Sequence, residues 1–101
     1  MDFAKNISTN KNQFNTVRRG MKWSNLLIGE NLKITTPTTM EQAEVKNIRI
    51  LKFEDLNDDD LINNFDKTDG RSVNTLYKSM KTLYNGFDKR EVVILVDLEL
   101  I

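Results

Sequence analysis

The chain has 101 residues, 39% of them hydrophobic and 30% charged, and its 15 basic and 15 acidic side chains balance to a net charge of zero. This size and composition predict a single soluble globular domain with one modest core. The absence of cysteine and histidine excludes disulfides, thiolate metal sites and Cys nucleophiles, and it argues strongly against a zinc enzyme. Because no apolar run is long enough to cross a membrane and the N-terminus lacks the hydrophobic stretch of a signal peptide, we expect a cytoplasmic protein without metal or cofactor.

The charges are unevenly distributed along the chain. Residues 1–50 hold eight basic and four acidic side chains, whereas residues 51–101 hold seven basic and eleven acidic ones. The basic side chains between residues 11 and 22 are interrupted by no acid, and such a cluster attracts phosphate if the fold keeps it on one face. The neutral total favours the alternative, in which the two halves neutralise each other across the fold.

The first third of the chain gives one clear strand. Residues 1–13 are polar with isolated apolar side chains, and this pattern leaves a short strand, a helix and a partly ordered arm open. Residues 25–34 predict an apolar approach, a turn at Gly29 and a strand with Leu32 and Ile34 on one face.

The middle of the chain predicts a loop, a strand and a short acidic helix. The sole proline, Pro37, marks a loop over residues 35–39. The β-branched residues between Val45 and Phe53 predict a strand, and their imperfect alternation indicates a bulge or a bend. Asn57 or Asp58 is suited to cap a short helix that follows it.

The last third predicts the clearest helix and the central strand. Apolar residues between Val73 and Tyr84 recur every three or four positions, Ser72 is a suitable N-cap, and Gly86 is a suitable stop. Residues 91–100 form a strand that is apolar on both faces at its start and on one face at its end, which is typical of a strand at the centre of a sheet.

A polar segment near the N-terminus carries the densest functional chemistry. Between residues 15 and 23 it gathers a hydroxyl, two guanidiniums, an ammonium and the only tryptophan, in Thr16, Arg18, Arg19, Lys22 and Trp23. Such a segment suits a ligand-binding surface, with cations for phosphate and an aromatic ring for a base. For Trp23, burial in the core is the more frequent alternative, because aromatic residues are mostly buried.

Several short motifs stand in a characteristic order. They are Thr16-Val17-Arg18, Gly29-Glu30, residues 48–56, Asp69-Gly70, residues 76–84 and residues 93–98. From about Phe14 to Ile101 the chain thereby resembles the ASCH domain of the PUA-like superfamily. The resemblance implies an α+β fold, namely a small PUA-like β-barrel with two or three helices packed outside. It implies one domain over residues 14–101, preceded by an N-terminal arm or first element over residues 1–13.

The resemblance also implies functions and site residues. ASCH proteins are generally linked with RNA or nucleic-acid binding, and one bacterial branch resembles an amidohydrolase of N4-acetylcytidine with a Lys, a Thr and a Glu in its site. By motif, Thr16 matches the threonine, Arg18 an accompanying arginine and Asp69 the glutamate, with a shorter side chain. Gln13 stands where that branch has its lysine.

The first hypothesis is therefore an RNA-binding or nucleotide-binding module. Its cleft would be lined by Thr16, Arg18 and Asp69, with Arg19, Lys22 and Trp23 as further ligand contacts. A simpler role for Arg18 is a buried ion pair with Asp69.

The second hypothesis is an amidohydrolase, with Thr16 as nucleophile, Lys22 or Lys11 as the activating amine and Asp69 as the acid. A glutamine at position 13 cannot take the threonine proton, so this resemblance implies ligand binding more strongly than hydrolysis.

The third hypothesis is a bacteriophage or mobile-element accessory protein that binds a host protein, which would suit the small size and the frequent asparagine. Its contact would be an acidic patch, for which a solvated helix N-terminus is the simpler explanation. The patch consists of Glu54, Asp55, Asp58, Asp59 and Asp60.

Overall fold

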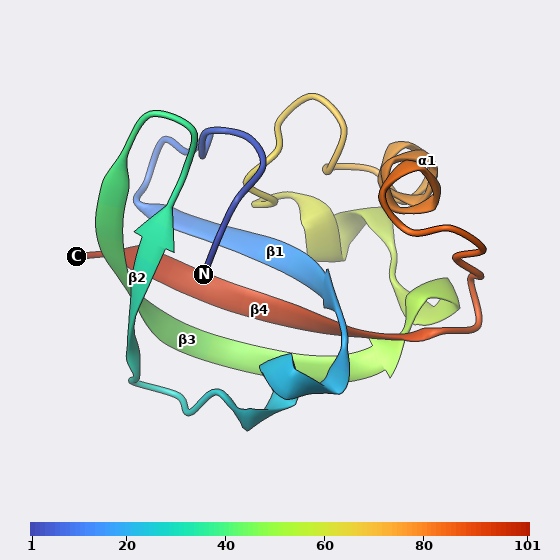
Figure 1. The fold of residues 1–101 in the computed structure, drawn as a ribbon, viewed down its shortest axis with the longest axis horizontal. Helices are drawn as coiled ribbons and strands as arrows, with labels where there is room; N and C mark the ends of the chain where they lie inside the picture. Colours follow the sequence, from blue (N-terminus) through green and yellow to red (C-terminus); the bar gives the residue numbers. More distant parts are fainter.

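A computed structural model describes residues 1–101 and contains one four-stranded antiparallel sheet, one α-helix and three short 3₁₀ helices. The strands are β1 (Gln13–Arg19), β2 (Asn31–Thr35), β3 (Met40–Lys52) and β4 (Val92–Leu100), paired in the order β1-β4-β3-β2. The helices are η1 (Met21–Asn25), η2 (Phe53–Asp55), η3 (Asp58–Leu61) and α1 (Val73–Leu83). The sheet curls into a half-barrel, and α1 lies beside one end of it (Figure 1).

The strands follow their predicted patterns. The final apolar run becomes β4, which has β1 on one side and β3 on the other, so its predicted central place is confirmed. A register shift between Val45 and Asn47 confirms the bulge expected in the second strand. That strand begins earlier than predicted, at Met40, because it forms a hairpin with β2 around the proline loop.

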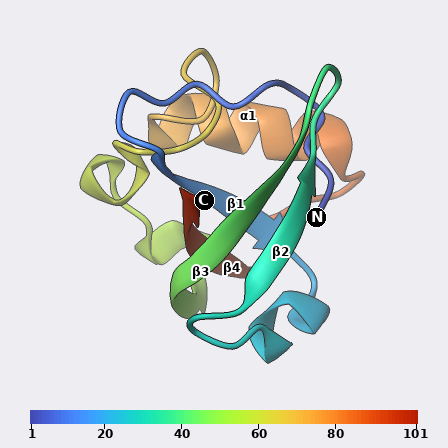
Figure 2. The same cartoon turned by 90° about the vertical axis from the view of Figure 1, so that its left-hand side faces the viewer.

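The N-terminal arm, residues 1–13, borders the sheet and supplies part of its core. The backbone N–H of Phe3 donates to the carbonyl of Thr35 at 2.8 Å, so the arm runs beside β2 (Figure 2). The Phe3 side chain is 5% exposed and packs edge-on against Phe14 inside the half-barrel. The sequence left this segment unassigned, since its only tertiary partners come from distant parts of the chain.

The opposite edge of the half-barrel is bordered by residues 63–65. The N–H of Asn15 in β1 donates to the carbonyl of Asn63 at 2.8 Å, and the N–H of Phe65 donates back to the carbonyl of Asn15 at 2.9 Å. The N–H of Ser8 in the arm donates to the carbonyl of Phe65 at 2.9 Å. Both outer strands therefore have covered backbone edges, which protects a small sheet from pairing with other chains.

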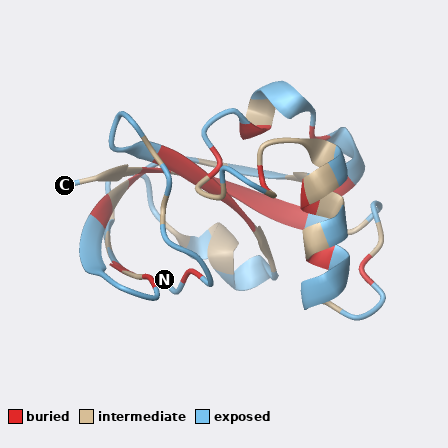
Figure 3. Ribbon diagram, turned by 90° about the horizontal axis from the view of Figure 1, so that it is seen from above, coloured by how far each residue is buried: buried red, intermediate tan, exposed pale blue.

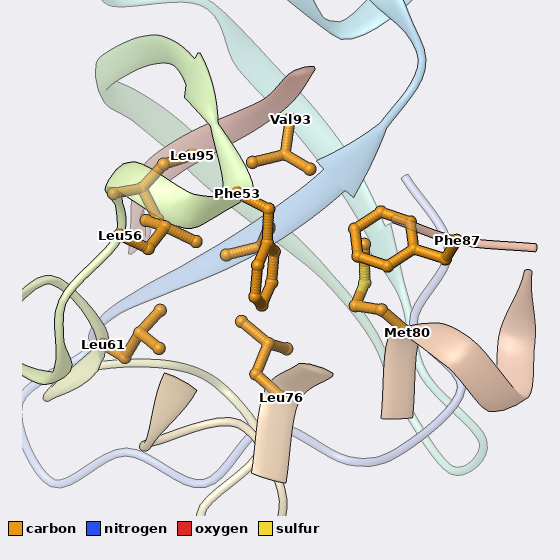
Figure 4. Close-up of a cluster of buried hydrophobic side chains, with 9 residues drawn as sticks. Phe53, Leu56, Leu61, Leu76, Met80, Phe87, Val93 and Leu95 are labelled. Carbon is orange, nitrogen blue, oxygen red and sulfur yellow. The ribbon is translucent and has the colours of Figure 1, made fainter. Parts of the chain in front are cut away.

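The sheet separates two apolar clusters because side chains alternate between its faces. The inner cluster fills the half-barrel and consists of Phe3, Phe14, Ile34, Ala43, Val45, Ile94, Val96 and Leu98. The outer cluster lies between the other face and α1 (Figure 4) and consists of Val17, Phe53, Leu56, Leu61, Leu76, Met80, Phe87, Val93 and Leu95. Buried residues accordingly concentrate along β4 and on the side of α1 that faces the sheet (Figure 3).

The predicted helix is confirmed and ends one residue earlier, at Leu83. The Ser72 hydroxyl accepts from the N–H of Thr75 at 3.2 Å, as its N-cap role requires, and Leu76 and Met80 are buried. The sequence also predicted two or three outer helices, whereas the structure has one α-helix and single 3₁₀ turns. The acidic segment forms a single 3₁₀ turn, and Asn57 and Asp60 close a capping box at its N-terminus, as the predicted cap requires. No helix of the structure is long and apolar enough to cross a membrane.

Candidate functional site

A pocket of about 230 Å³ opens between β1, the N-terminal arm, the segment 64–70 and α1. Thr16, Arg18 and Asp69 all line it, so three of the predicted ligand-binding residues converge although 51 positions separate Arg18 from Asp69. Aromatic and aliphatic side chains of the arm, of Phe65 and of α1 supply the apolar wall. This convergence makes the pocket the candidate site.

Thr16 and Arg18 share the inner face of β1 because they are two residues apart. Thr16 is 1% exposed, and its Oγ1 accepts a hydrogen bond from Nε of Arg18 at 3.1 Å. The hydroxyl and the guanidinium are thus joined by a hydrogen bond in the lining of the pocket.

Arg18 is half-buried and has no carboxylate partner. Its guanidinium lies 4.5 Å from the ring centre of Phe3 and 5.3 Å from that of Trp23, and no ion pair includes it. Burial lowers the pKa of Arg18, but an arginine keeps its charge at neutral pH. The pocket therefore presents a cation held by aromatic rings rather than neutralised by an acid.

Asn64 lines the pocket and carries a buried hydrogen-bond donor without a partner. Its side chain is 1% exposed, and its Oδ1 accepts from the N–H of Asp66 at 2.9 Å, whereas its Nδ2 has no partner. A buried donor without an acceptor is costly. Sequence reasoning missed Asn64, because nothing distinguishes it among the many asparagines of this chain.

Asp69 pairs with a lysine of the arm and not with Arg18. The Nζ of Lys5 lies 2.8 Å from Asp69 and 3.0 Å from Asp66, and the hydrogen bonds that it donates to Asp69 and to Asp66 raise the pKa of Lys5. Desolvation raises the pKa of Asp66, but its hydrogen bonds with the N–H of Asp69 and with Lys5 lower it overall. The proposed Arg18–Asp69 ion pair is thus absent, and Lys5, which the sequence did not single out, takes its place.

Arg19, Lys22 and Trp23 do not line the pocket. Arg19 points to the other face of β1, where it pairs with Glu91 at 2.7 Å and lies 5.2 Å from the ring centre of Tyr84. Trp23 is half-buried against the inner cluster, and the ammonium of Lys22 lies 4.9 Å from its ring centre. Trp23 reaches the site only through its contact with Arg18.

Gln13 and Lys11 also lie away from the pocket. The amide of Gln13 donates to Glu99 at 3.3 Å on the sheet face opposite Thr16, and Lys11 precedes β1. No lysine is among the pocket-lining residues. The amine that the amidohydrolase hypothesis places beside Thr16 is therefore missing from this position.

Two members of the acidic patch stabilise the fold. An oxygen of Asp58 accepts from the N–H of Val73 at 2.8 Å, at the start of α1. Asp60 pairs with Arg49 at 2.6 Å and closes the capping box of η3. The hydrogen bond from the N–H of Asn57, and after it the hydrogen bond from Arg49, lower the pKa of Asp60. Glu54, Asp55 and Asp59 remain exposed. No group of three or more acidic side chains is arranged to hold a metal ion.

Comparison with known proteins identifies the architecture alone. The chain matches no family model and no curated protein. It is similar over the whole of both chains to the crystal structure of the hypothetical protein PH0355, with a TM-score of 0.61 and 17% sequence identity. At this identity the likeness shows a shared small α+β fold with a half-barrel sheet.

Proposed function

We propose that the protein is an RNA-binding or nucleotide-binding module with a PUA-like, ASCH-type barrel, and that the pocket of Thr16, Arg18 and Asp69 receives a single base. The observation that carries the proposal is Arg18, a half-buried guanidinium that opens on a pocket and pairs with no carboxylate. Natural proteins rarely leave such a charge uncompensated. A ligand oxygen that accepts from Arg18 would supply the missing partner.

The polar groups of the pocket suit the edge of a base. Arg18 offers donors for carbonyl oxygens or ring nitrogens, and Asp69 offers an acceptor for an exocyclic amine or a ring N–H. The volume of about 230 Å³ is below that of pockets for drug-sized ligands, which favours one base over a larger ligand. Phe65 and Tyr84 contribute aromatic surface beside it.

The same geometry supports binding over hydrolysis. The Thr16 hydroxyl accepts from Arg18 at 3.1 Å, and no neighbouring base is positioned to take its proton. Lys5 is the lysine closest to the pocket by contact, but two carboxylates hold its ammonium and raise its pKa. A lysine in that state is a poor general base.

Titration of the protein with nucleosides and with a short single-stranded RNA tests this function. Binding can be followed by the fluorescence of Trp23, because its ring contacts Arg18. We expect saturable binding that Arg18→Met weakens at least tenfold, the loss of one charge-assisted hydrogen bond. Arg19→Gln is the matched control, since it removes the same charge from the opposite face of β1. Absence of binding to every nucleoside and RNA would reject the proposal.

A deacetylation assay with N4-acetylcytidine separates the enzymatic alternative. Binding without turnover is expected. If the wild type deacetylates N4-acetylcytidine and Thr16→Ala does not, the protein is an amidohydrolase and the binding-module proposal is wrong.

A further inference from the structure

A second hollow lies on the other side of the segment 62–71 from the pocket. It has a volume of about 580 Å³ and is lined by the arm between Ile7 and Lys11, by Gln13 and by Ile62, Asn63, Lys67 and Arg71. Three of its lining residues are basic and none is acidic. We call it the basic groove, after Lys11, Lys67 and Arg71.

The three charges of the basic groove are free of acidic partners. The ammonium groups of Lys11 and Lys67 form no ion pair and no hydrogen bond, and both residues are exposed; the backbone N–H of Lys11 donates to the hydroxyl of Thr9 at 3.3 Å. Asp66 and Asp69, the acids next to Lys67 in sequence, bind Lys5 on the pocket side. The local charge is therefore positive although the whole chain is neutral.

Arg71 is held in place by carbonyl groups. Its Nε donates to the carbonyl of Asn64 at 3.0 Å, and one terminal nitrogen donates to the carbonyl of Ser8 at 2.7 Å. These bonds fix the guanidinium without neutralising it, and its other terminal nitrogen has no partner in the protein. A cation immobilised in this way binds an anion at a low entropic cost.

We propose that the basic groove binds the phosphodiester backbone of the single-stranded nucleic acid whose base occupies the pocket. This inference rests on the proposed function. Lysine, arginine, hydroxyl and amide groups are the usual phosphate contacts, and the groove combines three cations with Ser8, Thr9, Asn10 and Asn63.

The two sites share one chain segment. Asn64, Asp66 and Asp69 line the pocket, while Asn63, Lys67 and Arg71 line the groove. The pocket thus reads a base, and the groove holds the phosphates of neighbouring nucleotides.

The test compares a double variant, Lys11→Gln with Lys67→Gln, against a matched control, Lys33→Gln with Lys52→Gln. Both pairs are exposed and form no ion pairs, so each removes two positive charges without a fold contact. The ligands are uridine, an eight-nucleotide oligouridylate and the corresponding oligodeoxyuridylate, titrated over a range of salt concentrations. The deoxyuridylate has the same bases and lacks only the ribose 2′-hydroxyl, so it distinguishes a pure phosphate site from one that also needs this hydroxyl.

We expect the groove variant to bind the oligouridylate at least tenfold more weakly at low salt, while its uridine affinity is unchanged. Each lost phosphate contact lowers the slope of log affinity against log salt by about 0.7 for a single strand, so the slope should fall by about 1.4. The control variant should retain the wild-type slope. A wild-type affinity and slope in the groove variant would overturn the inference.

The outcomes also separate this inference from the proposed function. If uridine binds and the groove variant keeps the wild-type affinity for the oligonucleotide, the inference about the groove is rejected and the proposed pocket stands. If the groove variant binds the oligonucleotide more weakly than the wild type but uridine does not bind, the proposed pocket is rejected and the inference about the groove stands. Failure of all three ligands to bind would reject both.

Discussion

At the scale of single residues, Arg18 is a half-buried charge without an ion pair, an arrangement that folding stability alone does not favour. Its guanidinium lies over the rings of Phe3 and Trp23 and forms no ion pair, and the carboxylate of Asp2 acts on its charge without contacting it. Burial of a charge without a partner costs free energy, which the cation–π contacts offset in part.

We therefore expect Arg18→Met to change the free energy of unfolding by no more than about 1 kcal/mol, because methionine keeps the apolar stem and removes the desolvated charge. Urea unfolding at pH 7 measures the change. A loss above about 3 kcal/mol, the size found when a buried ion pair is broken, would show that Arg18 is a structural residue and would weaken its assignment to the site.

Gly70 is required by the close approach of the Asn64 side chain and not by its backbone conformation. A Cβ atom at this position would overlap the side-chain oxygen of Asn64, which is buried and bonded to the N–H of Asp66. Gly70→Ala should lower stability by about 1–3 kcal/mol, as overpacking does. In the double variant with Asn64→Ala the two losses should not add, since alanine lacks both the oxygen and the Cγ atom that the new Cβ would overlap. Full additivity in a double-mutant cycle would contradict this explanation.

Asp97 carries a pH dependence in the middle of β4. Burial raises its pKa above the ordinary value of 3.8, against the opposing effects of Asn15, Arg49 and Asn47. The folded state thus binds this proton more tightly than the unfolded state, so the free energy of unfolding falls as pH rises from about 3.8 through the raised pKa. Asp97→Asn should be more stable than the wild type at pH 7, and the difference should vanish at low pH.

Urea unfolding of both proteins at several pH values measures this difference, and Asp55→Asn, an exposed aspartate, is the control for loss of one negative charge. A difference that stays constant with pH would exclude Asp97 as the titrating group.

At the scale of elements, β1 decides which of the polar residues act together. The alternation of a strand sends Thr16 and Arg18 inward and Arg19 outward to Glu91. The basic segment is therefore two surfaces, although it is continuous in sequence.

The start of α1 is stabilised by two caps from different elements. Ser72 accepts from Thr75, and Asp58 of η3 accepts from Val73. Ser72→Ala and Asp58→Ala should each lower the free energy of unfolding by about 1 kcal/mol. Asp59→Ala is the matched control, since Asp59 is exposed, and it should cost less than about 0.5 kcal/mol. An Asp59 effect equal to that of Asp58 in urea unfolding would contradict the cap.

At the scale of the whole molecule, the N-terminal arm joins the barrel, the pocket and the basic groove. Phe3 is buried in the inner cluster and lies under Arg18, Lys5 pairs with the acids at the rim, and Ile7 to Lys11 line the groove. The arm therefore belongs to the same folding unit as residues 14–101.

Phe3→Ala should consequently destabilise the protein by about 3–5 kcal/mol, the usual cost of emptying an aromatic site in a core. Lys5→Ala, on the same arm, changes an exposed side chain whose ion pairs solvent screens, so it should cost much less than Phe3→Ala. Chemical denaturation of both variants measures this. Equal small losses would mean that the arm is not part of the cooperative core.

Much of the fold was predictable because local patterns dominate it. The stripe from Val73 to Leu83, the strand after Glu91 and the irregular strand around Val45 all carry their period in the sequence. The arm was not predictable, since single apolar residues such as Phe3 have no period and acquire a role only from distant partners.

The candidate site was predictable in part. Thr16, Arg18 and Asp69 were chosen from the sequence and do line one pocket. Lys5 and Asn64 were missed because a lysine or an asparagine in a polar segment carries no local signal.

By itself the sequence determined the elements, the central place of β4 and the chemical types available to a site, because periodicity, capping and composition are local properties. Only the tertiary structure decided that Arg18 forms no ion pair, that Asp69 binds Lys5, and that the arm lines the pocket. These facts depend on which distant segments come into contact when the sheet curls. Burial of apolar side chains in the shared core stabilises those contacts, and no single segment does so alone.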